Sequence, residues 1–218
     1  MPGGRPGDSD PKREPEVVVM RYFFNAEIEP TTLKGALTKV KGVEKVELKA
    51  ADRTVHVTWS GKCDDLAALE AAAEKAAVPA YLLSHAHVVF GAKAKKDPKP
   101  EQLYRELIAI SGVRHAHVLP GALDLHTDLE RLAILEVRGA GTNAGFEVLI
   151  KTHVWMEADV TEGEAEKVAK ELSLVKGVLV VKTLGERVMF WALKAVTDDQ
   201  VKKAAEKVGA KLGAIEKP

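Results

Sequence analysis

The hydrophobic positions along the chain repeat one pattern three times. In each repeat, apolar residues at helical spacing lead into a Gly-Val pair, and a strand-like run follows directly. The three glycines are Gly42, Gly112 and Gly177, and 70 and 65 residues separate them. This spacing is close to the length of one small α+β unit, so the pattern predicts a tandem array of a single module.

The first repeat predicts the element order βαββαβ. Apolar alternation and helical periodicity place strands at 16–24, 43–48, 54–59 and 78–83, and helices starting at Pro30 and spanning 66–77. In the third strand, for example, Val55 and Val57 alternate with His56 and Thr58. Such an order forms an antiparallel sheet with both helices on one face, the ferredoxin-like arrangement.

The third repeat predicts the same order. Expected strands cover 147–156, 178–183, 187–193 and 211–215. Each helix is expected to begin with a capping box, Thr161 with Glu164 and Thr197 with Gln200. The fold class is therefore α+β, built from tandem ferredoxin-like units.

The middle repeat departs from the pattern. A helix is expected at 98–110 and a hairpin from strands 113–119 and 132–137, with 120–130 as an insertion. The run 139–143, Gly-Ala-Gly-Thr-Asn, stands where a second helix should begin, so we expect a truncated unit.

The first strand of the middle unit has two interpretations, which the sequence leaves open. It either covers 86–91 after a tight turn at Ser84-His85, or is one long strand from Tyr81 that two units share. The expected organisation is a disordered tail (1–15), a first unit (16–84), a divergent middle unit (85–145) and a third unit (146–218).

Composition narrows the function classes. The 218 residues include 32 Lys plus Arg and 32 Asp plus Glu, so the formal net charge is zero and electrostatic dependence on a nucleic acid is not expected. No apolar run is long enough to span a membrane. Residues 1–15 lack the apolar core of a signal peptide. We expect a cytoplasmic protein if the chain is complete, and an exported one if a signal peptide was removed.

The unit resembles the heavy-metal-associated domain of copper chaperones and metal-pump amino termini. The resemblance rests on the βαββαβ length of about 70 residues, on a first helix that ends in Lys-Gly-Val, and on the strand 43–48, Val-Glu-Lys-Val-Glu-Leu. It covers about residues 16–84 and 146–216. In that family a Cys-x-x-Cys between the first strand and the first helix chelates a soft ion.

The matching positions of this chain hold no cysteine. They read Phe-Asn-Ala-Glu-Ile-Glu at 24–29 and Trp-Met-Glu-Ala-Asp at 155–159, and the only cysteine of the chain is Cys63. The functional residues of the family therefore carry over to no position. Met156, as a thioether, and the acidic residues of these segments are weaker candidate ligands.

Histidines offer a different metal chemistry. His85 with His87, and His115 with His117, each place two imidazoles on one face of a strand, because side chains alternate with period two. His126 lies nearby in sequence. If the two pairs converge, the group could hold Zn(II), Cu(II) or Ni(II). The alternative is the polar face of two ordinary strands, since the first and second strands of a ferredoxin-like unit are not neighbours.

Other functions have less support. Trp155, Phe190 and Trp191 could stack RNA bases on a central strand, but the chain has no RNP1-like motif. No phosphate loop, nucleophile elbow or His-Glu-x-x-His motif is present, so we do not expect an enzyme or a required cofactor.

The sequence favours a non-enzymatic binding or scaffold module that has lost the thiolate site. Apolar runs such as 17–20 and 188–191 leave too few polar residues for two solvated sheet faces, which predicts a protein partner or self-association. The alternative is a transition-metal-binding or trafficking protein that uses the histidine pairs.

Overall fold

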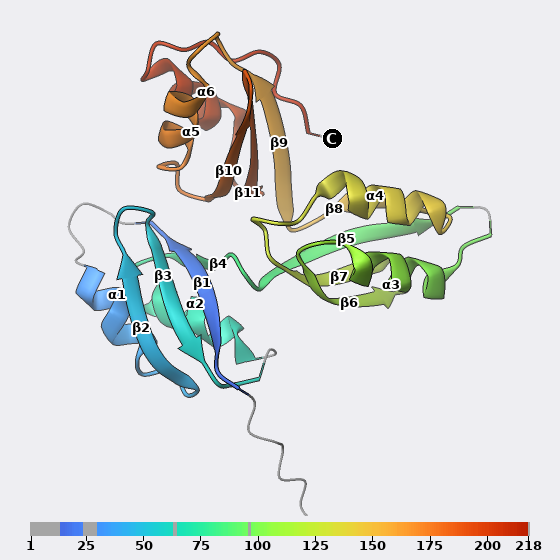
Figure 1. Cartoon of the computed structure of the whole chain (residues 1–218), viewed down its shortest axis with the longest axis horizontal. Coiled ribbons are helices and arrows are strands. Elements are labelled where there is room, and N and C mark those ends of the chain that lie inside the picture. Colours follow the sequence, from blue (N-terminus) through green and yellow to red (C-terminus); the bar gives the residue numbers. More distant parts are fainter. Residues whose placement is uncertain (1–13, 24–29, 63–64, 96, 218) are drawn as a thin grey trace, which may run out of the picture. The chain divides into compact units, whose positions relative to one another are not determined.

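The computed structural model describes residues 14–23, 30–62, 65–95 and 97–217. By its contacts the chain divides into two compact units, residues 1–80 and 81–218. The described residues form three antiparallel sheets, labelled in Figure 1 with their helices. We call the three βα groups the first, middle and third modules. This architecture confirms the predicted α+β class with ferredoxin-like units.

The first module has the predicted order βαββαβ. Its elements are β1 (Glu16–Tyr22), α1 (Pro30–Leu37), β2 (Val43–Lys49), β3 (Thr54–Trp59), α2 (Ala67–Lys75) and β4 (Ala80–Leu82). The strand order in the sheet is β2-β3-β1-β4. Val18 pairs with Val57, and both side chains are fully buried. Alternation along each strand therefore places one face in the core.

The middle module is complete, so the predicted truncation is wrong. Its elements are β5 (Ala86–Ala94), α3 (Pro100–Ala109), β6 (Val113–Leu119), β7 (Ala122–Thr127), α4 (Ile134–Asn143) and β8 (Phe146–Ile150). The strand order is β6-β7-β5-β8, the same βαββαβ topology as in the first module. Helix α4 occupies the segment where the sequence predicted a strand and a loop.

Two local features explain the error. Gly121 adopts a φ of 75° in a tight turn, so β7 begins at Ala122 and residues 120–130 are not an insertion. Gly141 lies inside α4, where a Cβ atom would come within 2.4 Å of the Val148 side chain. Glycine weakens an isolated helix, but here it permits close packing of α4 on β8, and tertiary packing overrides propensity.

The boundaries between modules also differ from the prediction. Strands β4 and β5 are separate, with Ser84-His85 between them, which decides between the two interpretations of this segment. The predicted strand 147–156 is divided in two at Lys151-Thr152. Its first half, β8, pairs with β5 and belongs to the middle sheet, so the predicted domain boundary at residue 146 is wrong.

The third module contains β9 (His153–Asp159), α5 (Ala165–Leu172), β10 (Val178–Leu184), β11 (Arg187–Leu193) and α6 (Asp198–Glu206). Its sheet has the order β10-β11-β9. The expected closing strand is reduced to isolated bridges, Val160 with Leu212 and Glu157 with Glu216.

Only one of the two expected capping boxes is present. Thr197 and Gln200 form the predicted capping box of α6. The side chain of Thr161 instead hydrogen-bonds the backbone of Lys211, and α5 starts without a side-chain cap.

The three repeat glycines adopt the same backbone conformation. Gly42, Gly112 and Gly177 have φ values of 97°, 92° and 94°, in the region that L side chains rarely adopt. At Gly112 a Cβ atom would lie 2.8 Å from the Leu132 nitrogen and 2.9 Å from the Asp128 oxygen. These are backbone atoms, so the neighbouring loop would have to move.

We predict that Gly112→Ala lowers the free energy of unfolding of the middle module by about 1 to 3 kcal/mol, from the positive φ and the backbone clash. Gly139→Ala is the matched control, because Gly139 lies in α4 with no atom within 4 Å of the added Cβ. We expect the control to be neutral or stabilising by up to about 1 kcal/mol. Urea unfolding of both variants measures this. Equal stability of Gly112→Ala and the parent would contradict the assignment.

Candidate metal centre

Three histidines lie side by side on one face of the middle sheet. In the strand register His126 of β7 pairs with His87 of β5 on one side and with His115 of β6 on the other. Directly paired residues point to the same face of a sheet. The ring centroids of His87 and His126 are 5.0 Å apart, and those of His115 and His126 are 6.3 Å apart. We call these three residues the imidazole row.

The imidazole row occupies the face of the middle sheet that α3 and α4 do not cover. Its strand neighbours Val88, Leu125 and Ala116 are buried on the opposite face, whereas His87 and His115 are exposed. We call the exposed face the open face of the middle sheet. The hydrophobic alternation that builds the core therefore also presents the imidazoles to solvent.

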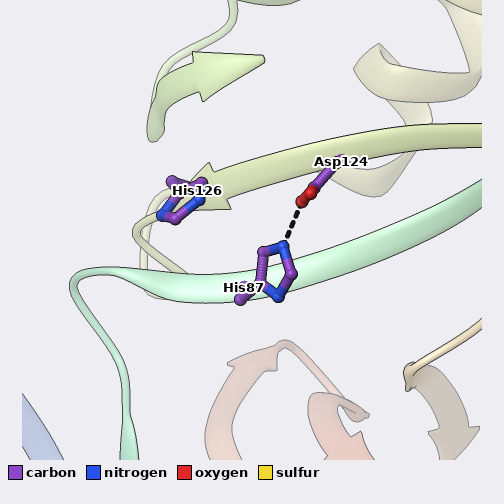
Figure 2. Close-up of side chains that lie close together, drawn as sticks. All are labelled: His87, Asp124 and His126. Carbon is purple, nitrogen blue, oxygen red and sulfur yellow. Dashed lines mark ion pairs between the residues drawn. The ribbon is translucent and has the colours of Figure 1, made fainter. Parts of the chain in front are cut away.

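A carboxylate completes a three-residue group. Asp124 precedes His126 by two positions on β7, so both side chains lie on the open face. The carboxylate of Asp124 forms an ion pair with Nε2 of His87, as Figure 2 shows. One ligand atom from each of His87, Asp124 and His126 lies within 4.8 Å of the other two. Among the described residues, this is the group of metal-ligating side chains that meets that distance.

Burial favours the metal-binding form of His126. Desolvation lowers the pKa of this imidazole below its usual value, and the neighbouring His87 lowers it further, while Asp124 acts in the opposite direction. A neutral imidazole has a free nitrogen lone pair, which a metal ion requires. His126 therefore stays in its ligand form at a lower pH than an ordinary histidine does.

His153, the first residue of β9, interacts electrostatically with His87. Burial, and secondarily the charge of His87, lower the pKa of His153 to about 4. Its Nδ1 lies 3.0 Å from the hydroxyl oxygen of Thr152. At neutral pH this imidazole is therefore uncharged.

The two His-x-His pairs, whose convergence the sequence leaves open, do not come together as a whole in the structure. His85 is 2% exposed, lies before β5 begins, and contacts the Ser84 hydroxyl through Nδ1 at 3.0 Å. It is therefore not on the open face with His87. His117 is exposed beside His115 on β6 but is not part of the three-residue group. The strands β5 and β6 flank β7, so His126 connects the two sides.

Sequence reasoning missed Asp124 and His153. The i, i+2 spacing of Asp124 and His126 is the same signal that marked the histidine pairs. It was hidden because residues 120–130 were interpreted as an insertion rather than a strand.

The equivalent positions of the other two sheets carry different side chains. The pair that corresponds to His87 and His126 is Val17 with Thr58 in the first sheet and Trp155 with Trp191 in the third. In each sheet the strand on the other side of the central one, β2, β6 or β10, has a register shift at the equivalent place. In β6 this shift lies between Val113 and His115. The imidazoles are thus a feature of the middle module rather than of the repeat.

Residues 155–159 of the third module, which match the Cys-x-x-Cys loop of the heavy-metal-associated domain in sequence, do not form a metal site in this structure. Residues 155–159 belong to β9 rather than to a loop. Met156 is fully buried in the core, and Glu157 and Asp159 both form ion pairs with Arg187. The corresponding residues 24–29, and Cys63, lie outside the described residues.

The structure does not support the RNA-stacking alternative. Phe190 packs in the helix-covered core of the third module, and Trp155 and Trp191 are 6% and 0% exposed. Trp155 donates its indole hydrogen to Glu157 at 2.6 Å. Aromatic faces that stack bases have to be accessible.

No protein-family model matches this chain, and no curated protein matches it. Among solved structures it is similar to the N-terminal soluble domains of Bacillus subtilis CopA, with 14% identity, a TM-score of 0.38, and coverage of 63% of this chain and 95% of that one. A second structure, of the water-soluble region of the P-type ATPase CopA from the same organism, has 16% identity, a TM-score of 0.38, and coverage of 63% and 92%.

A third match comes from work on crosstalk between Cu(I) and Zn(II) homeostasis. It has 19% identity and a TM-score of 0.25, and covers 31% of this chain and 98% of that chain. The fold class defined here follows from the strand order of the sheets themselves. Within the described residues, no helix is both long and apolar enough to cross a membrane.

We predict that His153 titrates near pH 4 in the folded protein. Its unfolded-state pKa is about 6.5, so the unfolded chain takes up the proton first as the pH falls. The free energy of unfolding should therefore fall between pH 6.5 and about 4, by up to about 3 kcal/mol, and this contribution should level off below.

An NMR titration of the imidazole resonances measures the pKa of His153, and His153→Gln identifies its signal. A midpoint near 6.5 would contradict the burial of this side chain.

Proposed function

We propose that this chain is a non-enzymatic metal-binding protein that takes a divalent transition-metal ion on the open face of its middle sheet. The ligands are His87, Asp124 and His126. The observation that carries the proposal is that their ligand atoms already lie within 4.8 Å of one another. The fold alone implies no function, so the proposal depends on this group.

The spacing suits a single ion once the side chains move by about 1 Å. Zinc–nitrogen and zinc–carboxylate bonds are about 2.0 to 2.2 Å long, so two ligand atoms of one ion lie at most about 4.2 to 4.4 Å apart. In a tetrahedral site such atoms lie roughly 3.3 to 3.6 Å apart, so the longest separation in the group, up to 4.8 Å, has to shorten by about 1 Å. Rotation of the exposed His87 side chain can supply this, because it is half exposed and held by one ion pair.

The ligand types indicate the class of metal. Imidazole nitrogen suits Zn(II), Cu(II) and Ni(II), and a carboxylate is compatible with the same ions. The described part of the chain provides no thiolate, which a soft Cu(I) ion would favour. We expect affinities to follow the general order for such ligands, with Cu(II) binding most tightly.

A metal ion would replace the contact between His87 and Asp124. The pair between His87 and Asp124 uses Nε2 of the imidazole, and a metal ion at that nitrogen requires its lone pair. Asp124 then exchanges one partner, the imidazole, for another, the ion. The carboxylate thus holds His87 in place before the metal arrives.

A scaffold function is the second candidate. Tyr104 and Leu119 line one shallow groove between α3 and β6, and both are about half exposed, as is Ile108 on the next turn of α3. Apolar groups gathered in this way occur at protein interaction surfaces. This interpretation predicts no specific metal affinity.

We predict that tag-free, chelator-treated protein binds one equivalent of Zn(II) with submicromolar affinity. The double variant His87→Ala, His126→Ala should lose at least 100-fold, because two of three ligands are removed and the third is a lone carboxylate. Isothermal titration with Zn(II), Ni(II) and Cu(II) measures both proteins.

His56→Ala is the matched control. It removes one imidazole from β3 in the first module and leaves the middle sheet intact, so its affinity should equal that of the parent. Binding in the parent that is only weak and multi-site would favour the scaffold candidate. Equal losses in the control and in the double variant would point to scattered surface binding instead.

A further inference from the structure

The chain that follows β8 continues alongside β5 beyond the end of the strand. Phe90 pairs with Ile150, the last residue of β8. The backbone nitrogen of Lys151 then donates to the oxygen of Val89 at 2.8 Å, and the nitrogen of Val89 donates to the Thr152 hydroxyl at 2.9 Å. Two further residues are therefore held against β5.

Continued by one more residue, this register brings His153 opposite His87. His87 lies two positions before Val89 on β5, and the chain after β8 runs antiparallel to that strand. The electrostatic influence of His87 on His153 is consistent with this placement. The order of imidazoles across the open face is thus His115, His126, His87 and His153.

His153 also belongs to a second sheet. It is the first residue of β9 and pairs with Leu193 of β11 in the third module. Both modules lie in the same compact unit, residues 81–218. A change in the position of His153, such as one caused by metal binding at the middle sheet, would therefore reach the sheet of the third module.

The Thr152 hydroxyl suits a ligand role for His153. Histidines that bind metal ions usually donate their other ring N–H to an oxygen, which fixes the tautomer and the ring orientation. Nδ1 of His153 already lies 3.0 Å from the Thr152 hydroxyl oxygen. If Nδ1 carries the proton, the lone pair of Nε2 is free for an ion.

We propose that His153 is the fourth ligand of the ion held by His87, Asp124 and His126, and that metal occupancy thereby fastens the start of β9 to the middle sheet. This inference rests on the proposed function. A fourth ligand completes the tetrahedral coordination that Zn(II) adopts in closed sites. His153 lies outside the three-residue group, so the Thr152-His153 segment has to close onto the ion.

The consequence is a metal-dependent restraint between two modules. Without the ion, hydrogen bonds of Lys151 and Thr152 with Val89 hold the segment that links β8 to β9 against β5. With the ion, a coordinate bond from the first residue of β9 is added. The ion would therefore act on protein conformation, and the site would differ from a simple storage site.

The test compares Zn(II) binding and backbone protection in parent, His153→Ala and His153→Gln. We expect 10- to 100-fold weaker Zn(II) binding in both variants by isothermal titration, whereas His56→Ala should match the parent. Hydrogen exchange of the peptide covering residues 151–156 should slow on Zn(II) addition in the parent and not in the variants. His153→Gln keeps the side chain polar and of similar size, which guards against a loss caused by misfolding.

The outcomes separate the two proposals. If both His153 variants bind Zn(II) like the parent and gain the same exchange protection, the fourth-ligand inference is wrong and the three-residue site stands. If the parent binds no Zn(II), both fail. If His153→Ala loses affinity and protection while the double variant of His87 and His126 also loses affinity, both are supported.

Discussion

The register of β7 between β5 and β6 is the constraint on which the proposed site depends. Leu123 and Leu125 are fully buried under the helices of the middle module, and they fix which residues of β7 face the core. Asp124 and His126 alternate with them and must face outward. A slip of one residue would turn both ligands into the core and both leucines into solvent. The hydrophobic effect thus sets the geometry of a polar site.

The same register constraint acts in all three sheets, but the side chains it presents differ. One cross-strand position holds Val17 with Thr58, His87 with His126, and Trp155 with Trp191. The tryptophan rings meet edge to face at 5.2 Å, an apolar contact where the middle sheet places two imidazoles. One scaffold position therefore supports different chemistry according to the residue pair that occupies it, which is why the fold by itself does not identify the function.

Local signals in the sequence predicted much of the fold. The Gly-Val pairs, the strand alternation and the Thr197-Gln200 capping box act within a few residues, and the structure confirms them. Helix α4 was missed because Gly141 is favourable in it only through close packing on Val148 of β8, a contact that the local sequence does not reveal. The site was predicted only in part, because long-range strand pairing is not visible in the local sequence. The sequence singled out His87, His115 and His126, but their convergence depends on strand register. Asp124 and His153 join them only through that pairing.

The central claim is that His87, Asp124 and His126 bind one metal ion. The most direct test is a crystal structure of the Zn(II)-loaded chain with anomalous diffraction at the zinc edge. Our account predicts one strong peak on the open face of the middle sheet, about 2.0 to 2.2 Å from a ring nitrogen of His87, a ring nitrogen of His126 and an oxygen of Asp124. An ordered zinc peak elsewhere, with the pair between His87 and Asp124 intact and no peak beside it, would contradict the account.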